Sequence, residues 1–111
     1  MADPPDAVAA TAAAIPGLPP AASARLLGLL RAEPAVQEVW LYGSRAMGRH
    51  HPGSDIDLTL VAPNLSHHDR LRLMGALDDL LLPWSIDLSL HHELPEPLRQ
   101  HVARVGWRLV P

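Results

Sequence analysis

The residues best suited to chemistry are aspartates that follow a Gly-Ser turn. Gly43 and Ser44 stand between a strand-like and a helix-like segment, and ten residues separate them from Asp55, with Asp57 two positions later. Glycine permits close backbone approach, and the free N–H groups at a helix start attract phosphate. Aspartates two apart on a strand share a face, which suits a divalent cation held between protein oxygens and a polyphosphate.

A further carboxylate, Asp87, lies on the polar side of the next alternating segment. If the two strands are neighbours with aligned faces, Asp55, Asp57 and Asp87 form one patch beside the turn. Two-metal phosphoryl transfer requires such a set, with one cation on the phosphates and another lowering the pKa of the attacking hydroxyl. Close carboxylates repel one another, so an ionised patch implies bound metal.

Each feature alone also has a purely structural interpretation. A Gly-Ser turn is usually a helix cap, and exposed acids on a strand are usually a solvated face. Their combination favours function, because the turn and the aspartates serve one chemistry at one place.

The segments around these residues predict a small α/β fold of the α+β type, with helices packed on a short sheet. Strand formers over 36–42 end at the turn, and Ser44 is expected to cap a short helix through Met47. Strictly alternating apolar residues predict strands over 55–61 and 84–90. The predicted order is α, β, short α, β, α, β, α.

Longer helices are expected before, between and after these strands. The first begins at Pro19 and Pro20 and ends before Pro34. The second is capped by Ser66 and ends before Pro83. Its predicted core stripe consists of Leu71, Met74, Leu77 and Leu81. The last spans 94–105, and 107–110 is expected to form a short strand or tail.

Length and composition limit the possible functions. The 111 residues fit one domain, with a flexible Ala- and Pro-rich tail expected over 1–18 and the folded domain over 19–111. The absence of Cys excludes disulfides, thiolate catalysis and iron–sulfur clusters, so metal ligands must be carboxylates or His. Such a short chain has few residues for a deep substrate pocket, which suggests a partner.

Charge and hydropathy narrow the choice further. The net charge is -3, which argues against a broad cationic surface for long nucleic acid. Asp3 and Asp6 stand where a signal peptide would carry positive charge, and no segment has the roughly 18 unbroken apolar residues of a membrane helix. All nine basic residues are Arg, as expected for a GC-rich genome. These features favour a bacterial cytoplasmic protein.

The stretch LYGSRAMGRHHPGSDIDLTLV resembles the signature of the minimal nucleotidyltransferases of the DNA polymerase beta-like superfamily. The resemblance extends from about Leu26 to Val110 and includes WSIDLSL. It implies a polymerase-beta-type palm with a short mixed sheet. It also implies transfer of a nucleoside monophosphate, AMP from ATP in the favoured case, with loss of pyrophosphate and with Mg²⁺, or Mn²⁺ in its place, at a two-metal site.

The resemblance also assigns roles to individual residues. Gly43 and Ser44 match the triphosphate-holding turn, Asp55 and Asp57 the metal ligands, and Asp87 the third metal-binding or catalytic carboxylate. Arg45 matches an arginine common in this subgroup and is expected near the phosphates. Tyr42 stands where Phe is frequent, a change expected to affect packing only.

The same resemblance implies a protein partner. Proteins of this size are often encoded beside a helical HEPN-type protein, which is either a toxin or a substrate-binding companion. Some act as antitoxins by adding AMP to a tyrosine of that toxin. Three alternatives therefore stay open: adenylylation of a HEPN toxin, transfer to a small molecule held by a HEPN-like companion, and a non-catalytic module that neutralises the toxin by contact.

Six of the seven histidines occur in adjacent pairs, at 50–51, 67–68 and 91–92. Adjacent side chains diverge on a strand or a helix, so such a pair rarely chelates one ion. His50 and His51 differ because their loop connects the turn to the carboxylates, and contact with base, phosphate or partner stays open. Three tryptophans are expected to fill the core or a partner surface: Trp40, Trp84 and Trp107.

Overall fold

The computed structural model describes residues 15–110 of the chain. Along the sequence the elements are α2 (Pro20–Arg31), β1 (Glu38–Tyr42), α3 (Gly43–Ala46), β2 (Ile56–Val61), α4 (His67–Asp78), β3 (Ile86–Leu90), the 3-10 helix η2 (His91–Glu93), α5 (Glu96–Val105) and β4 (Trp107–Val110). The predicted order of helices and strands is confirmed, and the terminal segment is a strand.

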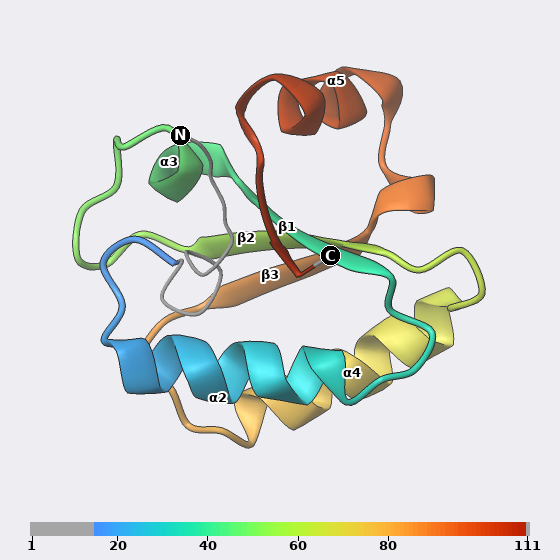
Figure 1. Cartoon of the computed structure of the whole chain (residues 1–111), viewed down its shortest axis with the longest axis horizontal. Helices are drawn as coiled ribbons and strands as arrows, with labels where there is room; N and C mark the ends of the chain where they lie inside the picture. The colour runs from blue at the N-terminus through green and yellow to red at the C-terminus, as the bar shows by residue number, and fades with distance from the viewer. Residues whose placement is uncertain (1–14, 111) are drawn as a thin grey trace.

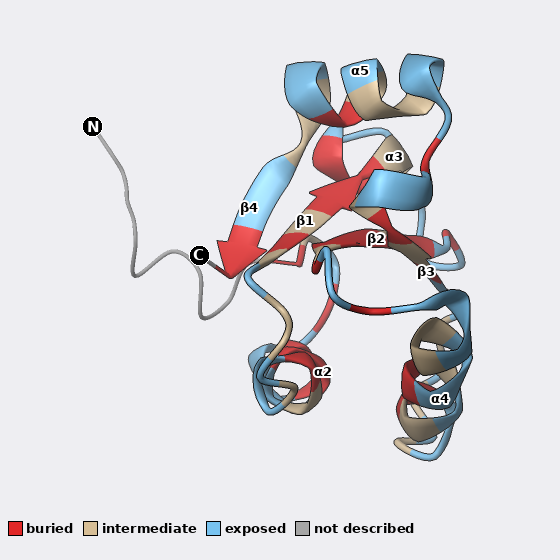
Figure 2. Cartoon of the chain, turned by 90° about the vertical axis from the view of Figure 1, so that its right-hand side faces the viewer, coloured by how far each residue is buried: buried red, intermediate tan, exposed pale blue. Residues whose placement is uncertain are grey.

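The strands form one mixed sheet in the order β3-β2-β1-β4. β1 is antiparallel to both β2 and β4, whereas β2 and β3 run parallel. Helices α2 and α4 cover one side of this sheet, and α3 and α5 lie on the other (Figures 1 and 2). The expected short mixed sheet with helices packed on it is confirmed.

The main core lies between the sheet and the pair α2 and α4 (Figure 2). Ile56, Leu58 and Leu60 of β2 are fully buried in it. A smaller apolar cluster under α5 is built on Tyr42 and Val102. Since side chains alternate along a strand, burying the leucines directs Asp57 to the α5 side of the sheet.

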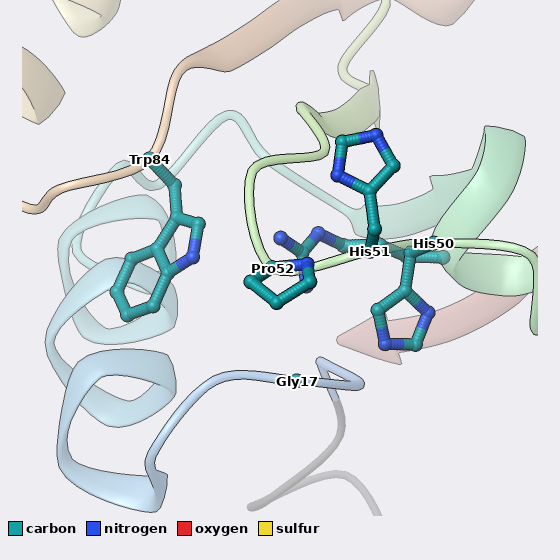
Figure 3. Close-up of a pocket in the computed structure, with 6 residues that line it drawn as sticks. Gly17, His50, His51, Pro52 and Trp84 are labelled. Atoms are coloured by element: carbon teal, nitrogen blue, oxygen red, sulfur yellow. The ribbon is translucent and has the colours of Figure 1, made fainter.

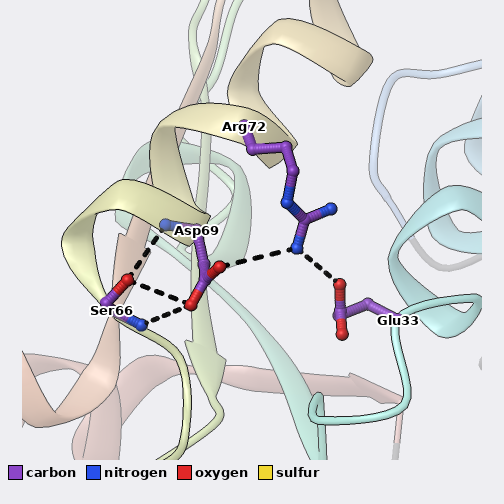
Figure 4. A network of polar contacts seen from close by, with 4 residues as sticks. All are labelled: Glu33, Ser66, Asp69 and Arg72. Atoms are coloured by element: carbon purple, nitrogen blue, oxygen red, sulfur yellow. Dashed lines mark hydrogen bonds and ion pairs between the residues drawn. The ribbon is translucent and has the colours of Figure 1, made fainter.

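A capping box starts α4, and an ion pair links this helix to the residues that follow α2 (Figure 4). The Ser66 hydroxyl accepts a hydrogen bond from the Asp69 amide, and the Asp69 carboxylate accepts one from the Ser66 amide at 2.9 Å. The hydrogen bonds that the Ser66 amide and hydroxyl donate to the Asp69 carboxylate hold its pKa below the usual value. Arg72 pairs with Glu33 at 2.8 Å, just beyond the end of α2. The predicted cap at Ser66 is confirmed.

The predicted core stripe of α4 is partly wrong. Leu71 and Leu81 have exposed fractions of 49% and 87%, whereas Leu73 and Leu77 are buried. The helix ends at Asp78, and the backbone of Leu81 has a φ of 56°, so the helical period no longer applies there. The predicted stripe correctly contained Leu77 and Met74, which packs against the core, but it missed Leu73, four residues before Leu77 on the same face.

The cap of the short helix is also different from the prediction. α3 begins at Gly43, its N-cap is Tyr42, and no side chain caps it. Ser44 is therefore inside the helix. Trp84 packs against the main core and Trp40 against the smaller apolar cluster, both half-buried, whereas Trp107 is 45% exposed. Within residues 15–110 no helix is long and apolar enough to cross a membrane.

The folded domain begins before the boundary predicted at residue 18. Ile15 and Leu18 are buried in the main core, and the Pro16 carbonyl accepts a hydrogen bond from Arg45 at 2.6 Å. Residues 15–18 thus belong to the domain, because two of their side chains are part of its main core. The rest of the predicted tail, 1–14, lies outside the described residues.

This packing can be tested by substitution. Ile15→Ala should lower the free energy of unfolding by about 2–5 kcal/mol, because a fully buried side chain is truncated. Leu81→Ala, which truncates an exposed side chain, should change it by less than about 0.5 kcal/mol. Urea denaturation measures both. Equal effects of the two substitutions would contradict the placement of residues 15–18 in the core.

Candidate active site

The turn after β1 can be built only with glycine. Gly43 has a φ of 75°, in the left-handed region that side chains disfavour. A Cβ at this position would also collide with Oδ2 of Asp57. The backbone of the turn therefore lies directly against the carboxylate. The structure thus brings Gly43 and Asp57, fourteen positions apart in the sequence, into contact.

The parallel pairing of β2 and β3 places Asp57 directly opposite Asp87. Across the other edge of β2, Tyr42 is the register partner of Asp57. Register partners share a face of the sheet, so Tyr42, Asp57 and Asp87 form a row across three adjacent strands. Asp55 immediately precedes β2 at the same end. This arrangement confirms that the two strands are neighbours with aligned faces.

The carboxylates in this row repel one another. The pKa of Asp57 is raised, first by burial and then by the charges of Asp87 and Asp55, while His101 and Arg45 lower it by smaller amounts. Asp57 is half-buried, whereas Asp55 and Asp87 are exposed. A cation beside the row would remove this repulsion.

The donor set fits a hard divalent cation that takes further ligands from its substrate. Carboxylate oxygens are what Mg²⁺ and Mn²⁺ prefer, and Mg²⁺ usually combines one or two protein carboxylates with phosphate oxygens and water. Within residues 15–110 no group of three or more His, Asp or Glu side chains is placed to hold a metal ion. The register pair Asp57 and Asp87 supplies the carboxylates that would hold such a cation together with a polyphosphate.

Two residues of this site were not predicted from the sequence as functional. The ring of Tyr42 packs edge-to-face on that of His101 from α5, with 6.2 Å between centroids. Burial raises the pKa of Tyr42, its contact with Ser89 lowers it, and Asp87 and Asp57 raise it further. Tyr42 thus lies among the carboxylates, beyond the packing role expected of it. His101 was assigned no role from the sequence, although its spacing from Leu98 and Val102 on one face of α5 could have placed it toward the sheet.

The Arg45 side chain is buried and connects two segments of the fold. Its guanidinium is buried and donates to the carbonyls of Pro16 and Ser54, at 2.6 and 2.8 Å. These bonds tie the segment before α2 to the loop before β2. Ser44 is half-buried, and its carbonyl accepts from the Arg49 amide at 2.8 Å. Contact of Arg45 or Ser44 with phosphates stays a prediction.

The match to known proteins decides the family. Residues 25–110 match the family model described as polymerase beta, nucleotidyltransferase. The chain belongs to this nucleotidyltransferase family. The family predicted from the Gly-Ser and Asp-x-Asp motif is thus confirmed.

One relative found by sequence is named as a protein adenylyltransferase. The chain is 34% identical over 68 residues to "Probable protein adenylyltransferase MntA" of Haemophilus influenzae. That match covers 60% of this chain and 60% of the relative, less than two thirds of its length.

Solved structures extend the likeness to three dimensions. A crystal structure of a toxin–antitoxin with AMP-PNP contains a chain 31% identical, with a TM-score of 0.66, covering 77% of this chain and 69% of that one. The structure of the tri-AMPylated Shewanella oneidensis HEPN toxin in complex with MNT antitoxin contains one 28% identical, with a TM-score of 0.60 and coverages of 77% and 66%.

The close approach at Gly43 can be tested against a matched glycine. Gly48 has nearly the same backbone, with a φ of 71°, but nothing lies within 4 Å of an added Cβ. Gly48→Ala should cost roughly 1–2 kcal/mol of stability, the penalty for a left-handed alanine, and leave nucleotidyl transfer intact. Gly43→Ala should cost more and abolish transfer, because its methyl group displaces Asp57. Denaturation and transfer assays with both variants measure this, and an active Gly43→Ala variant would contradict it.

The raised pKa of Asp57 predicts how stability depends on pH. The folded state binds this proton more tightly than the unfolded state, so stability falls as pH rises from about the ordinary Asp value of 3.8 through the raised folded value. Asp57→Asn removes this loss. In chelator and without divalent cations, it should raise the melting temperature at neutral pH, with a smaller gain below the ordinary Asp pKa.

Asp69→Asn is the control of opposite sign. Hydrogen bonds from Ser66 lower the pKa of Asp69, so its stabilising effect is present at neutral pH and lost in acid. Asp69→Asn should therefore lower the melting temperature at neutral pH. A lower melting temperature for Asp57→Asn as well would show that carboxylate repulsion does not strain the fold.

Proposed function

We propose that the protein is a metal-dependent adenylyltransferase that moves AMP from ATP to a hydroxyl group, a tyrosine of a HEPN-type partner protein. The observation that carries this proposal is the in-register pair Asp57 and Asp87 beside the glycine turn. The turn and the pair combine a place for phosphates with hard oxygen ligands at one end of a sheet.

Different residues of the site bind the triphosphate and the metal ions during in-line transfer. Gly43 and Ser44 seat the triphosphate, because the glycine lets the backbone approach the reacting groups closely. Asp55, Asp57 and Asp87 hold divalent cations, Mg²⁺ or Mn²⁺, which when bound neutralise the charge of the triphosphate and leaving group.

Asp87 is suited to handle the acceptor. It is exposed on β3, the edge strand of the sheet, where an incoming hydroxyl has access. Its carboxylate would accept the hydroxyl proton while the oxygen attacks the α-phosphorus. The bond from that phosphorus to the bridging oxygen then breaks, and pyrophosphate leaves with the electron pair.

The relatives support a protein acceptor. One solved neighbour is a toxin–antitoxin with AMP-PNP, and another is a tri-AMPylated HEPN toxin in complex with an MNT antitoxin. The named sequence relative is a protein adenylyltransferase. An open carboxylate face at an edge strand is compatible with an acceptor presented by a second protein.

The proposal is tested with radiolabelled ATP and the HEPN-type partner. Label at the α-phosphate should appear on the partner, and label at the γ-phosphate should not, because AMP is transferred. Asp55→Asn combined with Asp57→Asn should reduce labelling to the uncatalysed background while the far-ultraviolet circular dichroism spectrum is unchanged.

Asp79→Asn is the control for loss of charge, since Asp79 is exposed at the end of α4. It should label the partner at the wild-type rate. Unchanged labelling by the double variant would contradict the assigned role of the aspartates. Inhibition of the partner without ATP, and without a mass increase, would instead indicate neutralisation by contact.

A further inference from the structure

A pocket with both polar and apolar lining lies near the end of the sheet where β2 and β3 begin (Figure 3). Its volume is about 290 Å³. Three separate stretches of chain contribute: the segment before α2, the loop between α3 and β2, and the residues before β3. The lining consists of Gly17, Arg45, His50, His51, Pro52 and Trp84.

Arg45 brings a buried positive charge without a direct ion pair into this pocket. The side chain is only 1% exposed, and it forms no ion pair within the described residues 15–110. Its terminal nitrogens donate to two neutral carbonyls, while the buried Nε has no hydrogen-bond partner. Burial lowers the pKa of Arg45, and the charge of Asp57 opposes this by a smaller amount. A buried guanidinium with no direct ion pair and an unpartnered Nε is costly, so an anion would be favoured here.

The rest of the lining adds hydrogen-bonding groups and no opposing charge. Nδ1 of His50 is buried and also lacks a partner. His51 contributes a second imidazole, and none of the lining residues is acidic. Trp84 supplies an apolar wall opposite Pro52 (Figure 3). The pocket therefore offers donors from a guanidinium and two imidazoles to a ligand that must supply acceptors.

Gly17 keeps the pocket closed on one side. A Cβ at Gly17 would meet the Arg45 guanidinium and the ring of His50, and its φ of 88° is left-handed. The segment before α2 can thus lie flat against these side chains only with glycine here. The position makes the segment part of the pocket wall.

We propose that this pocket binds a phosphate group, at a site separate from the triphosphate-seating turn. Gly43 lies against Asp57, whereas Arg45 reaches Pro16 and Ser54, and none of the carboxylates of the row lines the pocket. Arg45 and the imidazoles would contact the phosphate oxygens through charge-assisted hydrogen bonds. The phosphate group is either free phosphate or part of a nucleotide.

This site would influence the catalytic carboxylates through the backbone. Arg45 holds the carbonyl of Ser54, the residue directly before Asp55. An anion bound to Arg45, His50 and His51 would restrict the movement of the loop that precedes Asp55. The inference concerns binding alone and stands whether or not the protein adenylylates a partner.

The test uses the indole N–H signals of the full chain in proton–nitrogen NMR. Of the three tryptophans only Trp84 lines the pocket, and Trp84→Phe assigns its signal. Titration with sodium phosphate, with sodium chloride at equal ionic strength as reference, should shift the Trp84 signal saturably. The signals of Trp40 and Trp107 should stay in place.

Histidine variants show which groups bind. His50→Gln with His51→Gln should weaken phosphate binding by about tenfold or more, the effect of losing charge-assisted hydrogen bonds. His51→Gln alone removes an exposed side chain, so it provides a folded second variant that should also weaken binding. His91→Gln with His92→Gln is the matched control, because that pair lines a pocket without an arginine and should leave binding unchanged.

Two further arms locate the site and identify the source of the phosphate. The Asp57→Asn variant should still bind phosphate. If it does not, the claim that the pocket is separate from the carboxylate site is overturned. A Trp84 shift that saturates at lower concentration with AMP than with phosphate assigns the site to a nucleotide phosphate, and equal or weaker AMP binding assigns it to free phosphate. Failure of Trp84 to shift with either probe would overturn the proposal, as would equal shifts of all three indoles.

Discussion

The parallel, in-register pairing of β2 with β3 is the constraint on which the active site depends. It sets Asp57 beside Asp87 on one face of the sheet. That register is fixed from the opposite face, where Leu58 and Leu88 are fully buried against α2 and α4. A slip by one residue would place an aspartate in the core, so the apolar side of the sheet determines the geometry of the polar side.

The carboxylate row is held under electrostatic strain, as is common at functional sites. Asp57 is half-buried next to like charges, and the backbone of Gly43 lies against it. Tyr42 and His101 support the row from the side of α5, where the apolar cluster is small. Most of the stabilising burial lies on the other side of the sheet, which allows the polar face to be open and charged.

Much of the site could be predicted because its turn and two of its aspartates lie close together in the sequence. The alternation of Ile56, Leu58 and Leu60 predicted the strand. The two-residue period of a strand predicted that the aspartates share a face, and glycine predicted the turn. The order and register of the strands involve contacts distant in sequence, and no spacing along the chain encodes them. The segment pattern predicted a short sheet and the family resemblance a mixed one, but the structure supplied the pairing of Asp57 with Asp87.

The errors have the same origin. Leu81 fits a helical stripe, but the helix ends at Asp78 through a local backbone change that the period does not show. The tail prediction rested on composition, which cannot reveal that Ile15 covers the core or that Pro16 holds Arg45. His101 reaches the site only through the packing of α5 over the sheet.

The most direct measurement is a crystal structure of the protein with AMP-PNP and Mn²⁺, with the metal located by its anomalous scattering. The account predicts an anomalous peak within coordinating distance of Asp57 and Asp87, with the triphosphate on Gly43 and Ser44. Mn²⁺ and triphosphate bound away from these aspartates, or a nucleotide bound with no metal at the row, would contradict it.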